Sequence, residues 1–255
     1  MKIGFVGTGN ITSALVKGLC TSNNPPDKIL VSSRNEQNSK AREIDFEQVK
    51  IEKSNQNLVD SSGIVVLAVL PQNAEEIISP LHFKPHQKII SLLAGLRVAE
   101  VAPWVKPAKI LIRSVPLPCS AKHVGPIVIY PYDEEIAALF GLIGKIFLAA
   151  EESEIESFSI ITALMAPYYT IIQEVTEWAA GAGIERKRAA DYIVSMFGAL
   201  LSLVEELKNG DTSKLIQTSM TPGGINELAV KIISEQGGFD LWYKSLEAVK
   251  KRVEA

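Results

Sequence analysis

Short apolar runs rich in β-branched residues alternate with helical stretches over the first 150 residues of the chain. Strands are predicted at residues 3–6, 28–31, 64–69, 88–92, 110–112 and 127–130. The runs at 64–69 and 88–92 are apolar rather than alternating, as expected for strands of a parallel sheet that is covered on both faces. Helices are predicted between the strands at residues 11–20, 72–79 and 133–146. This βαβ alternation predicts an N-terminal domain of the α/β doubly wound, Rossmann-like class.

The pattern changes at the acidic segment 151–154, after which only long helical stretches are predicted. They cover residues 155–182, 186–209, 225–235 and 238–253. These helices leave little polar surface, for example at Tyr168-Tyr169 and at Met196-Phe197. A helical domain this apolar is expected to bury part of its surface in a partner. The sequence therefore predicts two domains, 1–152 and 153–255, the second an all-α dimerisation domain that forms a homodimer or a larger assembly of dimers.

Composition narrows the possible function classes. The chain is 47% hydrophobic and 22% charged, as in soluble globular proteins. Its net charge of −3 gives no basic field, so nucleic acid is not an expected partner. The longest uninterrupted apolar run, residues 64–70, is too short to span a membrane, and no membrane partner is expected. With only Cys20 and Cys119, a disulfide scaffold is excluded and a reducing, cytoplasmic location is predicted.

A glycine turn, Gly7-Thr8-Gly9-Asn10-Ile11, follows the first predicted strand. Gly7 permits a tight turn, and Gly9 lets the backbone approach a pyrophosphate at the N-terminus of the next helix. The third small position of the usual motif is Thr12, so an ordinary strand-to-helix turn stays open as an alternative. The strand before the turn, the helix after it and the surrounding α/β domain favour dinucleotide binding.

The second predicted strand ends at Val31-Ser32-Ser33-Arg34-Asn35, where an NAD-binding protein usually places an acidic residue. Hydroxyl groups and a guanidinium can hold a 2′-phosphate, which an acid would repel. NADP(H) is therefore the favoured cofactor. NAD remains open, because Arg34 could equally be an ordinary solvated residue and Glu36 follows closely.

Five segments occur in an order and at separations typical of one known family. They are Gly7-x-Gly9-Asn10, residues 65–72, Ser91-x-x-Ala94-Gly95, Arg113-x-x-Pro116 and Thr221-Pro222-Gly223-Gly224. Together they resemble the pyrroline-5-carboxylate reductase family over nearly the whole chain. The resemblance implies an N-terminal nicotinamide-binding domain and a C-terminal helical dimerisation domain. It also implies that NADPH or NADH reduces a cyclic imine carrying a carboxylate, a small imino acid, to give proline or a related product.

The resemblance implies roles for individual residues as well. Those expected at the pyrophosphate are Gly7, Gly9, Asn10 and Ile11. Those expected beside the adenosine half and its 2′-phosphate are Ser33, Arg34, Asn35 and Asn55. Those expected to border the nicotinamide are Ala68, Val69, Pro71, Ala94 and Gly95. Those expected at the substrate carboxylate are Thr221, Gly223, Gly224 and Asn226.

Departures from the family pattern concentrate on the substrate side. The family's Ala-Val-Lys-Pro reads Ala68-Val69-Leu70-Pro71 here, so its lysine is absent. The segment after Arg113 lacks the family's asparagine, and the glycines and serines that open the family's long central helix are replaced at residues 163–166. Two functions therefore stay open: an imine reductase, and a non-catalytic NADP-binding paralogue with a sensing or interaction role.

The segment Thr221-Pro222-Gly223-Gly224 also has a physical interpretation of its own. Thr221 suits a helix N-cap and Pro222 the first helical position, which would leave the amides of Gly223 and Gly224 facing a carboxylate. A plain, well-capped helix start is an equally good interpretation.

The absence of basic residues from 146 to 185 bears on the chemistry. A hydroxy-acid dehydrogenase needs a proton donor at the substrate oxygen, and this stretch offers no Lys or His. A protonated iminium accepts hydride without a strong enzymic acid, so the sequence favours C=N reduction, and no catalytic residue is assigned. Because His82, His86 and His123 lie in unlike segments, no metal site is expected.

Overall fold

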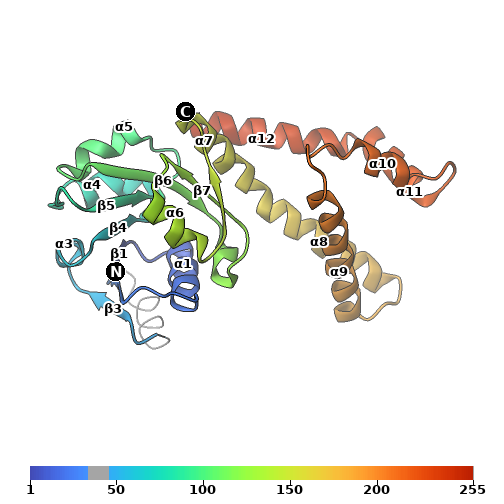
Figure 1. The fold of residues 1–255 in the computed structure, drawn as a ribbon. Coiled ribbons are helices and arrows are strands. Elements are labelled where there is room, and N and C mark those ends of the chain that lie inside the picture. The colour runs from blue at the N-terminus through green and yellow to red at the C-terminus, as the bar shows by residue number, and fades with distance from the viewer. Residues whose placement is uncertain (34–45, 255) are drawn as a thin grey trace. The chain divides into compact units, whose positions relative to one another are not determined.

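The computed structural model describes residues 1–33 and 46–254. It divides into two compact units, Met1–Ser159 and Ile160–Ala255. The first unit contains a sheet with helices on both faces, and the described residues of the second form helices joined by turns, with no strand among them (Figure 1). This is the predicted fold class, a doubly wound Rossmann-like domain followed by an all-α domain, and it is confirmed.

An eight-stranded sheet forms the centre of the first unit, in the order β3-β2-β1-β4-β5-β6-β7-β8. Its strands are β1 (Lys2–Val6), β2 (Lys28–Ser32), β3 (Val49–Glu52), β4 (Ile64–Leu67), β5 (Lys88–Ser91), β6 (Ile110–Pro116), β7 (Pro126–Tyr130) and β8 (Lys145–Leu148). Neighbouring strands run parallel except β6 and β7, which pair antiparallel. The strand order reverses direction between β1 and β4, and the crevice at such a switch point is where dinucleotides bind in this fold class.

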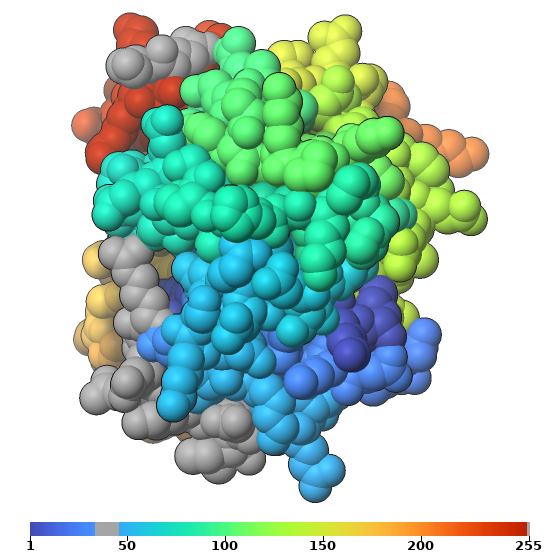
Figure 2. All heavy atoms as spheres, turned by 90° about the vertical axis from the view of Figure 1, so that its left-hand side faces the viewer, coloured from blue at the N-terminus to red at the C-terminus, as the bar shows by residue number. Residues whose placement is uncertain are grey.

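Helices cover both faces of this sheet, and the strands point successive side chains to opposite faces. The helices on one face are α1 (Asn10–Cys20) and α6 (Glu134–Gly141), and those on the other are α3 (Asn55–Asp60), α4 (Ala74–Ile78) and α5 (Val98–Val101) (Figure 1). In β4, for example, Ile64 and Val66 pack toward α1 and α6, whereas Val65 and Leu67 pack toward α3 and α4. Figure 2 shows the molecule from the side of α3, α4 and α5, with segments 50–110 coloured cyan to green.

Several element bounds in the first unit differ from the sequence prediction. The predicted helix 133–146 is wrong beyond residue 141, because α6 ends at Gly141 and residues 145–148 form β8. Gly144 lies between them, and a Cβ there would lie only 2.8 Å from the carbonyl oxygen of Gly125. The strand predicted at 110–112 continues to Pro116 because its second half pairs with β7. The short elements β3, α3 and α5 were not predicted.

The chain leaves the first unit through α7 (Glu152–Ile161). Ile155 of this helix is buried in a small cluster with Val128 and Ala149, so the first seven residues beyond the expected boundary of 152 belong to the first unit. The short 3₁₀ turn η4 (Thr162–Leu164) then interrupts the single helix predicted at 155–182.

The second unit consists of helices that bury little of their own surface. They are α8 (Met165–Gly181), α9 (Arg186–Glu205), α10 (Ser213–Ser219), α11 (Ile225–Glu235) and α12 (Gly238–Glu254). Among its described residues only Thr176, Ala179, Ala189 and Ile193 are buried. The tyrosines Tyr168 and Tyr169 are 40% and 65% exposed, and the stretch 152–181 is long and apolar enough, by length and composition, to cross a membrane.

Candidate functional site

Gly7 lies at the carboxyl end of β1, where the chain turns into α1. Its φ of +109° belongs to the region that favours glycine, and a Cβ at this position would clash with the carbonyl oxygen of Ala68. Its own polar groups are satisfied on both sides. The Gly7 N–H donates to Ser32 Oγ at 2.9 Å, and its carbonyl accepts from Thr12 Oγ1 at 3.0 Å. Thr12 stands where the usual motif has its third small residue, and its hydroxyl helps to hold this turn.

Gly9 serves a different purpose from Gly7. It is the N-cap of α1 with an extended backbone (φ −73°, ψ −175°), which any residue can adopt. Among the described residues, no atom lies within 4 Å of a Cβ built on Gly9, so these residues leave space directly before the first turn of α1. Backbone N–H groups and the positive end of the helix dipole face such a space, which is the geometry that binds phosphate. The loop therefore fits a pyrophosphate.

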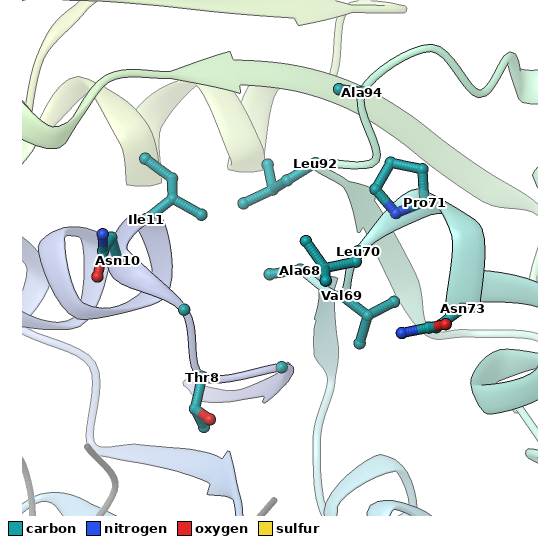
Figure 3. Close-up of a pocket in the computed structure, with 12 residues that line it drawn as sticks. Thr8, Asn10, Ile11, Ala68, Val69, Leu70, Pro71, Asn73, Leu92 and Ala94 are labelled. Carbon is teal, nitrogen blue, oxygen red and sulfur yellow. The ribbon is translucent and has the colours of Figure 1, made fainter. Parts of the chain in front are cut away.

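A cavity of about 580 Å³ adjoins this loop at the carboxyl ends of β1, β4 and β5 (Figure 3). Its lining residues are Gly7, Thr8, Gly9, Asn10, Ile11, Ala68, Val69, Leu70, Pro71, Asn73, Leu92 and Ala94. None of these side chains is ionisable, and most are apolar. A phosphate here would be held by backbone amides, and a planar ring would lie against aliphatic walls.

Most of the predicted cofactor residues come together in this cavity. The exceptions either do not line the cavity or lie outside the described residues. Gly95 follows Ala94 in a turn with φ +78° and does not line the cavity. Ser33 donates through Oγ to the carbonyl of Lys53 at 3.4 Å. Asn55 is the first residue of α3, and it too does not line the cavity. The predicted residues Arg34 and Asn35 lie outside the described residues.

Four residues of the cavity wall were not among the predicted site residues: Thr8, Leu70, Asn73 and Leu92. Leu92 directly follows β5 and Leu70 lies shortly after β4, so the rule that ligands bind beyond the carboxyl ends of parallel strands could have found both. Asn73 adjoins α4, but its side chain makes no capping hydrogen bond to that helix. It is one of the few polar side chains in this wall.

The glycine turn before α11 differs from its sequence interpretation. Thr221 is not the N-cap and Pro222 is not helical, because α11 begins at Ile225 with Gly224 as its N-cap. The Gly224 N–H donates to the Thr221 carbonyl at 2.8 Å, and Gly223 has a φ of +71°. A hydrogen bond across four residues, with Pro second and a positive-φ Gly third, is the signature of a type II β-turn. Gly223 is therefore required by the turn itself.

The amides expected at the substrate carboxylate already have partners. The Gly223 N–H donates to Glu227 Oε2 at 2.7 Å, and the Gly224 N–H serves the turn. The Asn226 side chain donates through Nδ2 to the carbonyl of Ser219 at 2.9 Å, which ties the turn to the end of α10. The Glu227 carboxylate thus already accepts a hydrogen bond from one of the amides that were predicted to bind the substrate carboxylate.

The fold and this cavity define a dinucleotide-binding protein of the doubly wound class with a helical second unit. Family models match both parts: "NADP oxidoreductase coenzyme F420-dependent" at residues 2–95 and "Pyrroline-5-carboxylate reductase dimerisation" at residues 152–255. The pyrroline-5-carboxylate reductase of Glycine max is 27% identical, covering 88% of this chain and 81% of its own. That of Vibrio alginolyticus is 24% identical, covering 99% and 96%.

Solved structures agree with these sequence matches. 1-Pyrroline-5-carboxylate reductase from Streptococcus pyogenes has a TM-score of 0.87 at 22% identity, covering 99% of this chain and 98% of its own. Pyrroline carboxylate reductase from Plasmodium falciparum, solved with NADP bound, also has a TM-score of 0.87, at 18% identity, covering 99% and 97%. The chain is thus similar over nearly its full length to pyrroline-5-carboxylate reductases, and residues 152–255 match the dimerisation domain of that family.

Proposed function

We propose that this protein is an NADP(H)-dependent oxidoreductase that reduces the C=N bond of a small cyclic imino acid such as pyrroline-5-carboxylate. The observation that carries the proposal is the cavity at the switch point, with its phosphate-binding loop at Gly7–Ile11 and an aliphatic wall from β4 and β5. The relatives that match 88% and 99% of the chain are named pyrroline-5-carboxylate reductases.

The residues of the cavity suit a reaction that needs orientation rather than acid catalysis. Bound NADPH would supply a hydride to the imine carbon and leave as NADP⁺. The Gly7–Ile11 loop holds the pyrophosphate, and Ala68, Val69 and Leu92 present an apolar surface that excludes water. An iminium nitrogen already carries its proton, so the absence of an ionisable side chain from the described lining is compatible with turnover.

The predicted roles of Asn10, Ile11, Pro71 and Ala94 at the cofactor belong to this proposal, as do those of Ser33, Arg34, Asn35 and Asn55 on its adenosine side. For the carboxylate of the substrate we retain the turn of Thr221, Gly223, Gly224 and Asn226. Binding there would require the substrate to displace Glu227 from the Gly223 amide, because one N–H cannot serve two carboxylates equally well.

The proposed assembly is a homodimer through the second unit, of which larger assemblies could be built. Its support is the match of residues 152–255 to a dimerisation model and the apolar surface of α8 and α9. On this account the apolar stretch 152–181 faces protein rather than lipid, and the protein is cytoplasmic.

The test of the function is an NADPH-oxidation assay over a panel of five- and six-membered cyclic imino acids, with NADPH and NADH titrated separately. Turnover of one panel member, with NADPH bound more tightly than NADH, is the expected result. Binding of NADPH without turnover of any panel member would contradict reductase activity and favour the non-catalytic NADP-binding alternative. Equal binding of the two cofactors would contradict the NADP preference.

A further inference from the structure

The loop that follows β5 forms one wall of the cavity. Leu92 and Ala94 lie in that wall, and the loop ends at Arg97, immediately before α5. At its near end, the Leu92 N–H donates to the carbonyl of Leu67 at 2.9 Å, which extends the pairing of β5 with β4. Gly95, with φ +78°, then turns the chain back. The position of the wall therefore depends on how the far end of this short loop is held.

Two glutamates of α7 hold that far end. Glu152 Oε1 accepts a hydrogen bond from the Val98 N–H at 2.6 Å, and Glu156 Oε1 accepts one from Arg97 Nε at 2.9 Å. Val98 is the first residue of α5, and an N–H at that position has no partner within its own helix. A carboxylate from a residue 54 positions later in the chain supplies it.

The same glutamates neutralise a buried arginine. Arg113 lies on β6 opposite Ser91 of β5, and its side chain is only 4% exposed. Its Nη1 lies 2.8 Å from Glu152 Oε1 and 3.7 Å from Glu156 Oε1. A buried charge is costly unless it is paired, so Arg113 fixes both carboxylates in place. We call Arg97, Arg113, Glu152 and Glu156 the α7 clasp.

We propose that the α7 clasp positions the nicotinamide wall of the cavity for hydride transfer, an inference that rests on the proposed function. In this fold class the first half of the sheet holds the adenosine side of the cofactor and the second half holds the nicotinamide side. The hydrogen bonds of the clasp to Arg97 and Val98 hold the end of the loop after β5, which belongs to the second half of the sheet, whereas the Gly7–Ile11 loop follows β1 in the first half. Glu152 and Glu156 are therefore positioning residues that act through the loop, and α7 also carries the chain into the second unit.

The clasp should affect the rate of hydride transfer more than cofactor affinity. A misplacement of about 1 Å at a reacting centre can cost about a hundredfold in rate, and a partial loosening should cost less. We expect Arg97→Gln and Glu152→Gln each to lower kcat by about tenfold, equivalent to about 1.4 kcal/mol. The Kd of NADPH should change by less than about threefold, because the phosphate loop keeps its contacts.

The experiment compares these two variants with the unaltered protein and with Arg186→Gln. Arg186 is a matched control, since its side chain is 62% exposed, as is that of Arg97, and it also forms an ion pair, with Glu177. Hydrogen–deuterium exchange of the full chain, with and without NADPH, provides a readout besides activity. Faster exchange of peptides covering 92–100 in the two clasp variants, with exchange around 7–16 unchanged, is expected.

Three outcomes would overturn the proposal. One is a kcat equal to that of Arg186→Gln in both clasp variants. Another is unchanged exchange at 92–100. The third is a lower melting temperature with kcat and exchange unaffected, which would make the clasp purely structural. Failure of the proposed function is distinguishable, because the unaltered protein would then turn over no imine, whether or not NADPH protects residues 7–16 from exchange. The exchange comparison without cofactor would still test whether the clasp holds the loop.

Discussion

At the scale of single residues, substitutions at Gly7 and Gly9 should show which glycine the loop needs for folding and which it needs for binding NADPH. Gly9→Val keeps an accessible backbone conformation, and its Cβ meets no neighbour among the described residues, but its side chain fills the space before α1. We expect the Kd of NADPH to rise at least about tenfold, or about 1.4 kcal/mol, with the melting temperature unchanged. Fluorescence titration with NADPH and a thermal unfolding curve measure the two effects.

Gly7→Ala is the matched comparison. Its positive φ and the clash with Ala68 place the new Cβ against backbone, so the free energy of unfolding should fall by about 1–3 kcal/mol. If Gly9→Val lowered the melting temperature as much as Gly7→Ala does, or bound NADPH normally, the space before α1 would not be the phosphate site.

Residues whose role depends on local spacing could be predicted from the sequence, and those whose role depends on a distant partner could not. Gly7 and Gly9 were found because a strand, a turn and a helix are consecutive in the chain. Nothing near Gly223 in the pattern indicated that Glu227 would take its amide, or that the hydrogen bond of a turn would fix Gly224. The sequence leaves a bound carboxylate and a plain helix start equally open there, and the positive φ of Gly223 accounts for that glycine without a ligand.

At the scale of elements, the start of α6 is stabilised by Asp133 in two ways. Its carboxylate accepts from the Ile136 N–H as the N-cap, and it pairs with Lys88 Nζ of β5 at 2.7 Å. Burial raises the pKa of the Asp133 carboxyl, but the hydrogen bonds from Lys88 and the Ile136 amide outweigh it, so the pKa is lowered below its usual value. A carboxyl with a depressed folded pKa contributes stability above its unfolded pKa and loses it as pH falls through the folded pKa.

Asp133→Ala should therefore cost about 1–2 kcal/mol of unfolding free energy at pH 7, the sum of a lost cap and a lost pair. The difference from the unaltered protein should shrink as the pH falls below about 4, the usual pKa of an aspartate in an unfolded chain, and through the lower pKa of the folded carboxyl. Asp133→Asn is the control, since asparagine caps equally well but cannot pair with Lys88. Urea unfolding at pH 7 and below about pH 4 measures the unfolding free energy of the three proteins. A cost independent of pH for Asp133→Ala would contradict the ion-pair contribution.

Elements with a strong apolar pattern of their own were predictable, and those whose state depends on distant partners were not. The helices 10–20 and 225–235 and the strands at β1, β2, β5 and β7 follow from local apolar periodicity. β8 was missed because its residues continue an apolar run that also suits a helix, and its strand state comes from pairing with β7. β3 contains only two apolar residues, and α5 is a single turn whose first amide depends on the distant Glu152. The local signal of α5 is Glu100, which accepts from the Arg97 N–H.

At the scale of the whole molecule, the second unit buries too little of itself to be stable as an exposed structure. The groove between α8 and α9 is lined by Tyr168, Ile171, Phe197, Leu200, Leu201 and Val204. Apolar surface costs about 25 cal/mol per Å² when it stays in water, and large exposed patches mark sites of association. The sequence predicts an association surface from composition alone, because helices with so few polar residues cannot bury all of their apolar surface against one another. Which helices carry the surface became known only from their packing.

Dimerisation is therefore expected to depend on this groove. The full chain should sediment at no less than twice 27.8 kDa at micromolar concentration, whereas Leu200→Glu should shift the equilibrium toward the monomer. A buried carboxylate in an apolar interface costs several kcal/mol, which is a dissociation constant raised by about two orders of magnitude or more. Val124→Glu is the control, because Val124 is 54% exposed, comparable with 51% for Leu200, and belongs to the first unit. Circular dichroism should confirm that both variants keep their helices. A monomeric unaltered protein would contradict the assembly, and a Leu200→Glu variant as dimeric as the control would place the interface on other helices of the second unit.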